Sequence, residues 1–435
     1  MRPAMRGSPS ILAQGVATKR TFCHLQQTMI HPSSSEPRRD VPSVVLGDVS
    51  LIRPLGKAGI RIVAVATDAN DISLRSKFVS EHVIVPGYAG EHQEETFRRL
   101  IELGNRLKAT HGQSIPLFYG QDKQLELIYR HRHEMESCFT FVISPESLGW
   151  SMLNKQKFSV LCETLGIRAP RTAPDVADRD TAIRGLRPPL LVKPKEKVEW
   201  HDIRDALFGG AAKARIFRDA DELLSHPTWP AFRDRVLVQE AIESPVGDLV
   251  SFHGFTSETG EMLAAFCGRK IRTFPAFAGE SAYIELAEDA SVAEEGRHVV
   301  KTLGLLGPFK IDFVRDPRDG KLYTLEINAR FNLWHALGAA AGLNLPVIAY
   351  DYLTAHRLPS TAPRITEPKV KWHSFWLDGH ALRETRAWDI RAYSELASAW
   401  IAGRLVHETF DITDPLPFAA WLGAFARDTI HNLFS

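Results

Sequence analysis

Two runs of alternating apolar residues, LGPFKIDFV (Leu306–Val314) and LYTLEINAR (Leu322–Arg330), flank the segment RDPRDGK (Arg315–Lys321). Such runs, separated by a proline and an Asp-Gly pair, are typical of a β-hairpin. Successive side chains of a strand point to opposite faces. One predicted face of the hairpin carries Phe309, Ile311, Phe313, Tyr323, Leu325 and Ile327. The other face carries Lys310, Asp312, Val314, Thr324, Glu326 and Asn328.

A turn centred on Asp319 would pair Asp312 with Glu326 across the two strands. Like charges directly opposite each other destabilise a sheet, and a bound cation removes the repulsion. Carboxylate and amide oxygens are hard ligands that suit magnesium. A hairpin with a solvated acidic face explains the same residues, so the spacing alone leaves both interpretations open.

Composition restricts the class of protein. The 435 residues are enough for roughly three domains of ordinary size. The net charge of +1 gives no support to nucleic acid or to an acidic membrane as a bulk partner. The four cysteines are scattered without a Cys-x-x-Cys motif, which indicates neither a zinc site nor a disulfide framework. We therefore expect a cytoplasmic protein with reduced thiols.

The first part of the chain divides near residue 40. Residues 1–40 are rich in Ser, Arg and Pro and contain no acidic residue before Glu36. They resemble a transit peptide, but a start codon assigned too far upstream, with Met29 as the true start, is the preferred explanation. Strand and helix patterns alternate over residues 41–143, which predicts a parallel sheet covered by helices. The Gly-x-Gly-x-x-Gly signature is missing there, which disfavours a nicotinamide dehydrogenase.

Several lysines after Ser144 occupy positions where an anion could bind. Lys155 lies in the first turn of a helix that ends at Gly166, and Lys193 closes the apolar strand PPLLVKP. A surface lysine, or one that extends from a strand end to water, explains each of them equally well. Lys213, which follows a Gly-Gly pair, lies either in a flexible phosphate-covering loop or in a plain turn.

Three cations follow one another in GRKIR (Gly268–Arg272), among phenylalanines on both sides. A run of charges is most often a solvated face, but the apolar and aromatic neighbours make a buried anion partner more plausible here than usual. His335 near the start of the next helix could be a base, although a single helical histidine is more often structural. Residues 356–435 hold five tryptophans and helical runs, and their pattern indicates packing without chemistry.

These pieces, in this order, resemble the ATP-grasp superfamily. The matching stretches are NKQKF with LGIRAP, LVKP, VQEAI followed by Asp248, the acids Asp312 and Glu326, and NARF (Asn328–Phe331). The detail around Gly47, Gly279–Ser281 and residues 339–346 is most similar to a branch of ATP-dependent ligases that resembles D-aspartate ligases. Asn154 stands where the family usually has Asp. The Ser/Gly-rich loop that commonly follows the Lys193 position is replaced by a long charged segment.

The resemblance implies an α/β (α+β ATP-grasp) fold with four parts. They are an extension (1–40), an N-terminal Rossmann-like domain (41–143), a two-lobed ATP-grasp domain (144–355) and a mostly helical C-terminal extension (356–435). It also implies the site. The nucleotide would be bound by Lys155, Lys193, Lys213, Gln239, Glu240, Ile242 and Asp248. Magnesium, or manganese in its place, would be held by Asp312, Glu326 and Asn328. The transferred phosphoryl group and the acyl phosphate would be stabilised by Lys270, Arg272 and Arg330.

The activity that the resemblance implies is ADP-forming ligation of a carboxylate to an amine, with ATP and Mg²⁺. Its partners would be small molecules, without nucleic acid or membrane, and a homodimer is one open option for its assembly. Alternatives are a nucleotide-binding protein without ligase turnover, an ATP-dependent carboxylase that uses bicarbonate, and, as the weakest, an NAD-dependent dehydrogenase. Neither the acid nor the amine can be identified from the sequence.

Overall fold

The computed structural model describes residues 39–195, 214–244, 248–276, 279–385 and 390–434. Contacts divide the chain into Met1–Pro32 and Ser33–Ser435, and every described residue belongs to the second unit. The predicted extension 1–40 therefore lies almost wholly outside the described residues. Among the described helices, none combines the length and the apolar character that crossing a bilayer requires.

The N-terminal part contains a five-stranded parallel sheet in the order β3-β2-β1-β4-β5. Its strands are β1 (Ser43–Leu46), β2 (Ile62–Ala66), β3 (Val79–Ile84), β4 (Ile115–Tyr119) and β5 (Phe139–Thr140). Its helices are α1 (Val49–Lys57), α2 (Gln93–His111), α3 (Asp122–Arg130) and α4 (Arg132–Glu136), with 3-10 turns η1 (Ile72–Arg75) and η2 (Gly90–His92). Every residue of β1, β2 and β4 is buried, as expected for strands covered on both faces.

The strand order of this sheet reverses between β1 and β4, because β2 and β3 follow on one side of β1 and β4 and β5 on the other. In open parallel sheets, ligands bind in the crevice at the carboxyl ends of the strands where the order reverses. The loops Gly47–Asp48 and Gly120–Gln121 leave the sheet at that point. The order of elements in this region also confirms the predicted alternation of strands and helices.

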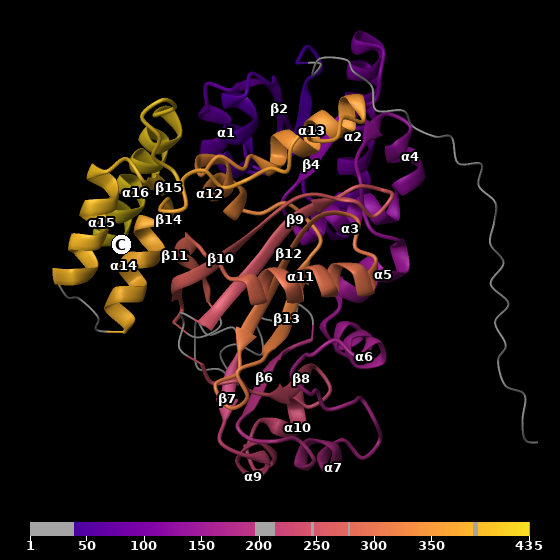
Figure 1. The fold of residues 1–435 in the computed structure, drawn as a ribbon, viewed down its shortest axis with the longest axis vertical. Coiled ribbons are helices and arrows are strands. Elements are labelled where there is room, and N and C mark those ends of the chain that lie inside the picture. The colour runs from indigo at the N-terminus through magenta and orange to yellow at the C-terminus, as the bar shows by residue number, and fades with distance from the viewer. Residues whose placement is uncertain (1–38, 196–213, 245–247, 277–278, 386–389, 435) are drawn as a thin grey trace, which may run out of the picture. The chain divides into compact units, whose positions relative to one another are not determined.

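A second, smaller sheet has three antiparallel strands in the order β7-β6-β8. These are β6 (Leu190–Pro194), β7 (Arg215–Phe217) and β8 (Val236–Glu240). Helices α7 (Arg179–Arg184), α9 (Ala220–Leu224) and α10 (Trp229–Phe232) lie beside it (Figure 1). Side chains of all three helices share one apolar core with the strands. Helices α5 (Glu146–Leu153) and α6 (Lys155–Leu165) precede it in the chain.

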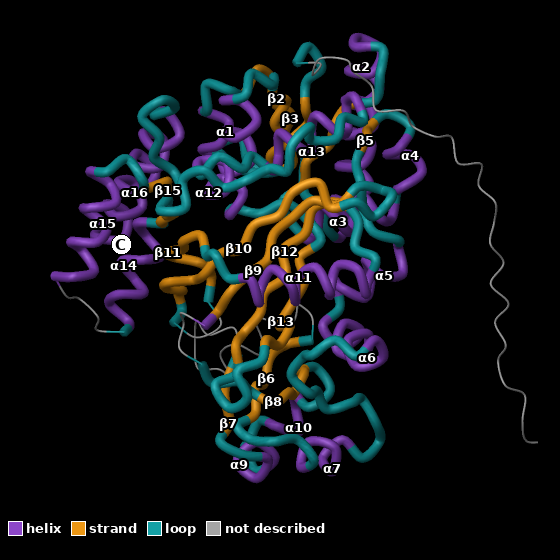
Figure 2. Tube along the Cα trace, viewed as in Figure 1, coloured by secondary structure: helices purple, strands orange, loops and turns teal. Residues whose placement is uncertain are grey.

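The largest sheet has seven strands in the order β13-β12-β9-β10-β11-β14-β15. They are β9 (Leu249–Thr256), β10 (Met262–Phe274), β11 (Glu280–Leu286), β12 (Gly307–Arg315), β13 (Leu322–Asn328), β14 (Lys371–His373) and β15 (Leu405–His407). Helix α11 (Ala290–Leu303) packs along β9 and β10 (Figure 2). Helices α12 (Trp334–Ala340) and α13 (Leu345–Ala355) follow the β12–β13 hairpin.

Residues 356–435 are mostly helical, as predicted, with α14 (Phe375–Glu384), α15 (Ile390–Ile401) and α16 (Leu416–Phe434). They also extend the large sheet, because β14 pairs antiparallel with β11 and β15 pairs parallel with β14. Helix α14 packs against β10 and β11, as Figure 1 also shows. The C-terminal segment is thus built onto the sheet that carries the predicted metal hairpin.

Candidate active site

The β12–β13 hairpin has the register predicted from the sequence at its polar residues. Asp312 pairs with Glu326, and Lys310 pairs with Asn328. The register shifts between Asp312 and Phe313, so that Phe313 pairs with Thr324 and Leu325 is the extra residue of a β-bulge.

Because of the bulge, the faces predicted for the residues near the turn are wrong. Thr324 was expected on the face of Glu326, but it pairs with Phe313 and is fully buried. Tyr323 was expected on the apolar face, but it pairs with Val314 on the other side of the sheet. One extra residue in a strand exchanges the faces of all residues beyond it, because the side chains alternate with a period of two.

Neighbouring strands extend the polar surface around Asp312. We call this surface the polar face; its residues are Ser251, His253, Lys270, Lys310, Asp312, Glu326 and Asn328. The Asp312 carboxylate lies 2.7 Å from Lys310 Nζ and 4.0 Å from Lys270 Nζ, and it accepts a hydrogen bond from the Ser251 hydroxyl. Burial alone would raise the pKa of Asp312, but the two lysines and the hydrogen bonds outweigh it and hold this pKa below the usual range.

The polar face fits a divalent cation by the chemistry of its donors. Asp312 and Glu326 supply carboxylates from opposite strands, and Asn328 supplies an amide whose Nδ2 donates to Glu326 over 3.1 Å. The described residues hold no group of three or more His, Cys, Asp or Glu side chains able to bind a metal. Two carboxylates are still sufficient for Mg²⁺, because this ion keeps several waters and takes further oxygens from a phosphate.

Two predicted nucleotide lysines come together although they lie on different elements. Lys155 opens α6, and its Nζ donates to the Pro194 carbonyl at 3.2 Å, next to Lys193 at the end of β6. Burial, together with the charge of Lys155, lowers the pKa of Lys193 to about 8, and the charge of Glu326 acts in the opposite direction. An anion bound between these ammonium groups would relieve their repulsion.

The predicted adenine-binding strand β8 runs beside β6, where Gln239 lies opposite Leu191. Gln239 and Glu240 are buried. The Glu240 carboxylate accepts the Arg187 backbone N–H at 3.0 Å and lies 3.4 Å from Arg171 Nη1. It therefore fastens the segment before β6.

The remaining predicted nucleotide residues follow β8. Ile242 is half-buried. Asp248 accepts a hydrogen bond from the Ser244 hydroxyl at 2.8 Å. Lys213, the candidate for covering the phosphates, lies outside the described residues.

Arg330 joins the metal hairpin to the N-terminal sheet. Its Nε lies 2.5 Å from Asp122 Oδ1, its Nη1 donates to the Gly120 carbonyl at 3.0 Å, and its Nη2 donates to Asn328 Oδ1 at 2.9 Å. Gly120 directly follows β4, where the strand order reverses. The guanidinium therefore sets the position of Asn328 relative to the crevice of the first sheet.

Arg272 is held from the C-terminal extension. The carboxylate of Asp378 in α14 accepts hydrogen bonds from Arg272 Nε at 2.5 Å and from Arg272 Nη2 at 2.8 Å. His373 Nε2 lies 3.0 Å from the same carboxylate. The guanidinium also stacks over Tyr283 at 4.6 Å from the ring centre. The prediction that residues 356–435 serve packing alone is therefore incomplete, since Asp378 fixes a predicted catalytic residue. No local pattern marks Asp378, which lies 106 positions from Arg272.

An aromatic layer covers part of the polar face. His253 stacks between Phe266 and Trp334, with ring centres 4.7 and 4.8 Å away, and the Lys310 ammonium lies 5.6 Å from the Trp334 ring. A Cβ on Gly268 would collide with the Trp334 ring, so this position needs glycine. Burial lowers the pKa of His335 to about 3 and that of His253 well below its usual value. Both rings are therefore neutral near pH 7.

Lys310 is the main candidate site residue that the sequence prediction did not assign. It is buried and forms the shortest ion pair to Asp312 among the charges of the polar face. The period-two pattern that selected Asp312 also placed Lys310 on the same face, so the signal was present in the sequence.

Comparisons with known proteins agree with this arrangement. Residues 203–332 match the family model described as ATP-grasp domain. The chain is 22% identical over 294 residues to the D-aspartate ligase of Enterococcus faecium (strain Aus0004), which covers 65% of this chain and 68% of that protein.

Two solved structures show the fold. The biotin carboxylase domain of Hydrogenobacter thermophilus 2-oxoglutarate carboxylase, in complex with MgADP, ADP and bicarbonate, superposes with a TM-score of 0.51 at 16% identity, covering 76% of this chain and 73% of that chain. The L-amino acid ligase from Bacillus licheniformis superposes with a TM-score of 0.52 at 14% identity, covering 72% and 74%. At such identities these two likenesses establish the fold alone. Together, the domain match, the sequence relative and the two folds show that this chain is similar to ATP-grasp proteins, with an ATP-grasp domain match over residues 203–332.

Proposed function

We propose that this protein is an ATP- and Mg²⁺-dependent ligase that joins a small-molecule carboxylate to an amine. The observation that carries the proposal is the Asp312–Glu326 pair, flanked by Lys270 and Lys310 on one face of the large sheet. Phosphoryl transfer requires positioning and neutralisation of charge more than covalent participation of the protein. A surface that presents two carboxylates for a metal beside two ammonium groups meets both requirements.

The reaction has two steps in which all groups are accounted for. The substrate carboxylate attacks the γ-phosphorus of ATP, so that an acyl phosphate forms and ADP leaves. The amine then attacks the acyl carbon, a C–N bond forms, the C–O bond to phosphate breaks, and phosphate and one proton are released. Bound Mg²⁺ would neutralise phosphate charge, and Mn²⁺ could replace it. The D-aspartate ligase and L-amino acid ligase among the similar proteins support this reaction class.

The chain's own residues would divide the work as follows. Lys155 and Lys193 bind the α- and β-phosphates, because Lys155 Nζ donates to the Pro194 carbonyl beside Lys193 and the two ammonium groups therefore lie close together. Asp312, Glu326 and Asn328 hold the metal. Lys270 faces the transferred phosphoryl group, and Lys310 keeps Asp312 ionised.

The two arginines would stabilise negative charge on the acyl phosphate and on the tetrahedral intermediate. Arg330 is fixed by three hydrogen-bonded contacts, to Asp122, Gly120 and Asn328. Arg272 is fixed by its two contacts to Asp378. Guanidinium groups held in this way need no reorganisation when charge develops.

The test begins with thermal unfolding in the presence of a non-hydrolysable ATP analogue and Mg²⁺, separately and together. A shared site predicts that the pair raises the midpoint by more than the sum of the two separate shifts. A screen for ADP release with amino acids and other carboxylates, each combined with amines or with bicarbonate, then identifies the substrates. Release of AMP, or the absence of any nucleotide-induced shift, contradicts the proposal. Turnover with bicarbonate and no amine would assign the protein to the carboxylases instead.

A further inference from the structure

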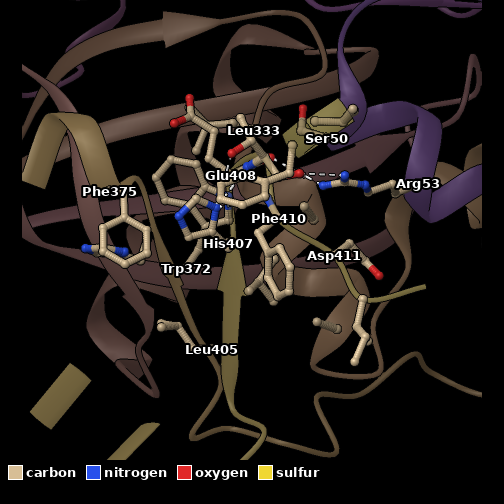
Figure 3. A pocket seen from close by; sticks show the side chains of 18 of the residues that line it. Ser50, Arg53, Leu333, Trp372, Phe375, Leu405, His407, Glu408, Phe410 and Asp411 are labelled. Carbon is tan, nitrogen blue, oxygen red and sulfur yellow. Dashed lines mark hydrogen bonds between the residues drawn. The ribbon is translucent and has the colours of Figure 1, made fainter. Parts of the chain in front are cut away.

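A cavity of about 1670 Å³ lies beside the C-terminal extension, bounded by α1, α12, α14, α15 and β15. Most of its wall is apolar, with Leu333, Trp372, Phe375, Trp400, Val406 and Phe410 among its residues. Figure 3 shows Phe375 on one side of the pocket and Arg53 with Asp411 on the other, with His407 and Phe410 between them. Ligand pockets measure roughly 300–1,000 Å³, so this cavity accepts a molecule much larger than a free small amino acid.

The apolar groups around this cavity are left without a cover by the described part of the chain. Among the described residues, twelve large apolar side chains are exposed, and nine of them lie between Phe375 and Phe425. Four of the nine line the cavity, namely Phe375, Tyr393, Trp400 and Ile412, which are 65%, 43%, 66% and 83% exposed. An apolar ligand would remove these surfaces from water.

The cavity adjoins the polar face in two ways. Leu333, Ala336 and Ala340 of the α12 region line the cavity, whereas Trp334 of the same region packs against His253 and Lys310 of the polar face. Asp378 also lines the cavity, and its carboxylate holds Arg272. A molecule in the cavity is therefore separated from the predicted catalytic groups by one layer of side chains.

Three carboxylates on the cavity wall, those of Asp48, Asp71 and Glu408, form no ion pair within the described residues. Glu408 accepts a hydrogen bond from the Ser374 hydroxyl at 2.5 Å, Asp48 accepts the Ser50 N–H at 2.8 Å, and Asp71 accepts the Ser73 N–H at 2.8 Å. The two cations of the wall, by contrast, are already paired, since Arg53 binds Asp414 and Lys57 binds Asp411.

Another polar group at this wall lacks a partner. His373 is 3% exposed and lines the cavity. Its Nε2 is bound to Asp378, and its Nδ1 has no hydrogen-bond partner in the part of the chain that the structure describes. Because Nε2 carries the proton toward Asp378, Nδ1 is an acceptor. The acceptor His373 Nδ1 and the unpaired carboxylates together fit a ligand that donates hydrogen bonds and carries positive charge.

We propose that this cavity binds a primary amine with a large apolar body, apart from the groups that would carry out the ligation, and that Glu408 and Asp48 recognise its ammonium group. Burial raises the pKa of Glu408 and the nearby Asp48 raises it further. A bound ammonium group would favour ionised Glu408 and relieve the repulsion between the two acids.

The test measures the binding of butylamine, hexylamine and octylamine to the full chain by isothermal titration calorimetry without ATP. Burial of the alkyl chain predicts an affinity that rises about fourfold for each methylene. Hexanoate and hexanol should bind at least about tenfold more weakly than hexylamine, because they lack the charge that the carboxylates recognise. This comparison needs no variant and is therefore independent of any folding defect.

Variants then locate the site. Glu408→Gln and Asp48→Asn keep the hydrogen bonds from Ser374 and Ser50 but remove the charges, and each should weaken octylamine binding by about tenfold or more. Ala336→Phe should weaken it by filling the cavity. The matched control is Glu102→Gln on the exposed surface of α2, which should leave the affinity unchanged. Equal binding of hexanoate, or no effect of alkyl length, overturns the proposal.

The same proteins separate this inference from the proposed function. If ADP release proceeds with small polar amines while alkylamines do not bind, the cavity proposal is wrong and the ligase proposal stands. If alkylamines bind in a Glu408-dependent way but no carboxylate gives ADP release, the ligase proposal is wrong and the cavity proposal stands.

Discussion

The ion pair between Asp312 and Lys310 offers the sharpest test of the site's electrostatics. Its Nζ–O distance is 2.7 Å, and the two side chains are only 6% and 11% exposed. Asp312→Asn keeps the shape and the acceptor for Ser251, but it leaves the charges of Lys310 and Lys270 uncompensated. Removing one partner of a buried pair costs about 3–5 kcal/mol, which we expect as the loss in the free energy of unfolding measured with urea.

A surface pair of the same length is the matched control. Arg132 Nε and Glu136 Oε1 are also 2.7 Å apart, but their side chains are 40% and 42% exposed. Glu136→Gln should therefore cost less than about 1 kcal/mol. The ratio between the two losses isolates the effect of burial at equal geometry.

A double variant decides whether the two charges are coupled. Lys310→Met in the Asp312→Asn background removes the uncompensated ammonium, so the double variant should be more stable than the sum of the single losses predicts. Strictly additive losses would refute the argument, because they would show that the two side chains stabilise the fold independently.

The pH dependence of stability gives a second readout of Asp312. Burial opposes its ionisation, but the two lysines and the hydrogen bonds hold its pKa below that of an unfolded aspartate, about 3.9. A lowered pKa in the folded chain means that the contribution of this group is complete above about pH 4 and is lost as the pH falls through the folded value. The urea midpoint of the wild type should therefore fall more steeply with acid than that of Asp312→Asn, and parallel curves would contradict this.

Three further predictions concern the other parts of the site. Glu326→Gln should abolish Mg²⁺-dependent ADP release. It should leave the thermal midpoint without metal unchanged or slightly higher, because it removes the like charge opposite Asp312. A large drop in the midpoint with activity retained would make the acids structural. The pKa of Lys193 is about 8, so the affinity for an ATP analogue should fall as the pH rises above 8. Lys193→Arg should remove this fall. An unchanged pH profile of the affinity in the variant would exclude Lys193 from the nucleotide site. Arg330→Lys should lower kcat by about 10²–10³-fold, because a lysine cannot hold all three present contacts and still stabilise the developing charge. An effect confined to KM would assign Arg330 to ground-state binding.

The sequence was sufficient wherever the signal is local. The alternation of side chains along two strands and the position of the turn predicted that Asp312 faces Glu326, because both depend on backbone geometry within about twenty residues. The parallel sheet of the N-terminal domain was predicted for the same reason. The β-bulge at Leu325 was not, since nothing in the strand pattern marks the extra residue, and it exchanged the faces of Tyr323 and Thr324.

The partners of the predicted catalytic arginines were decided by the tertiary structure. Arg330 meets Asp122, 208 positions away, and Arg272 meets Asp378, 106 positions away. Such pairs arise when separately formed elements pack, and no periodicity of either segment specifies them. The large cavity has the same origin, because its walls come from α1, α12 and the C-terminal extension. From the sequence alone one obtains the types of residue and the faces on which they lie, because a strand or helix repeats over a few residues. Only the packed chain determines which of these faces meet, because that depends on contacts between segments hundreds of residues apart.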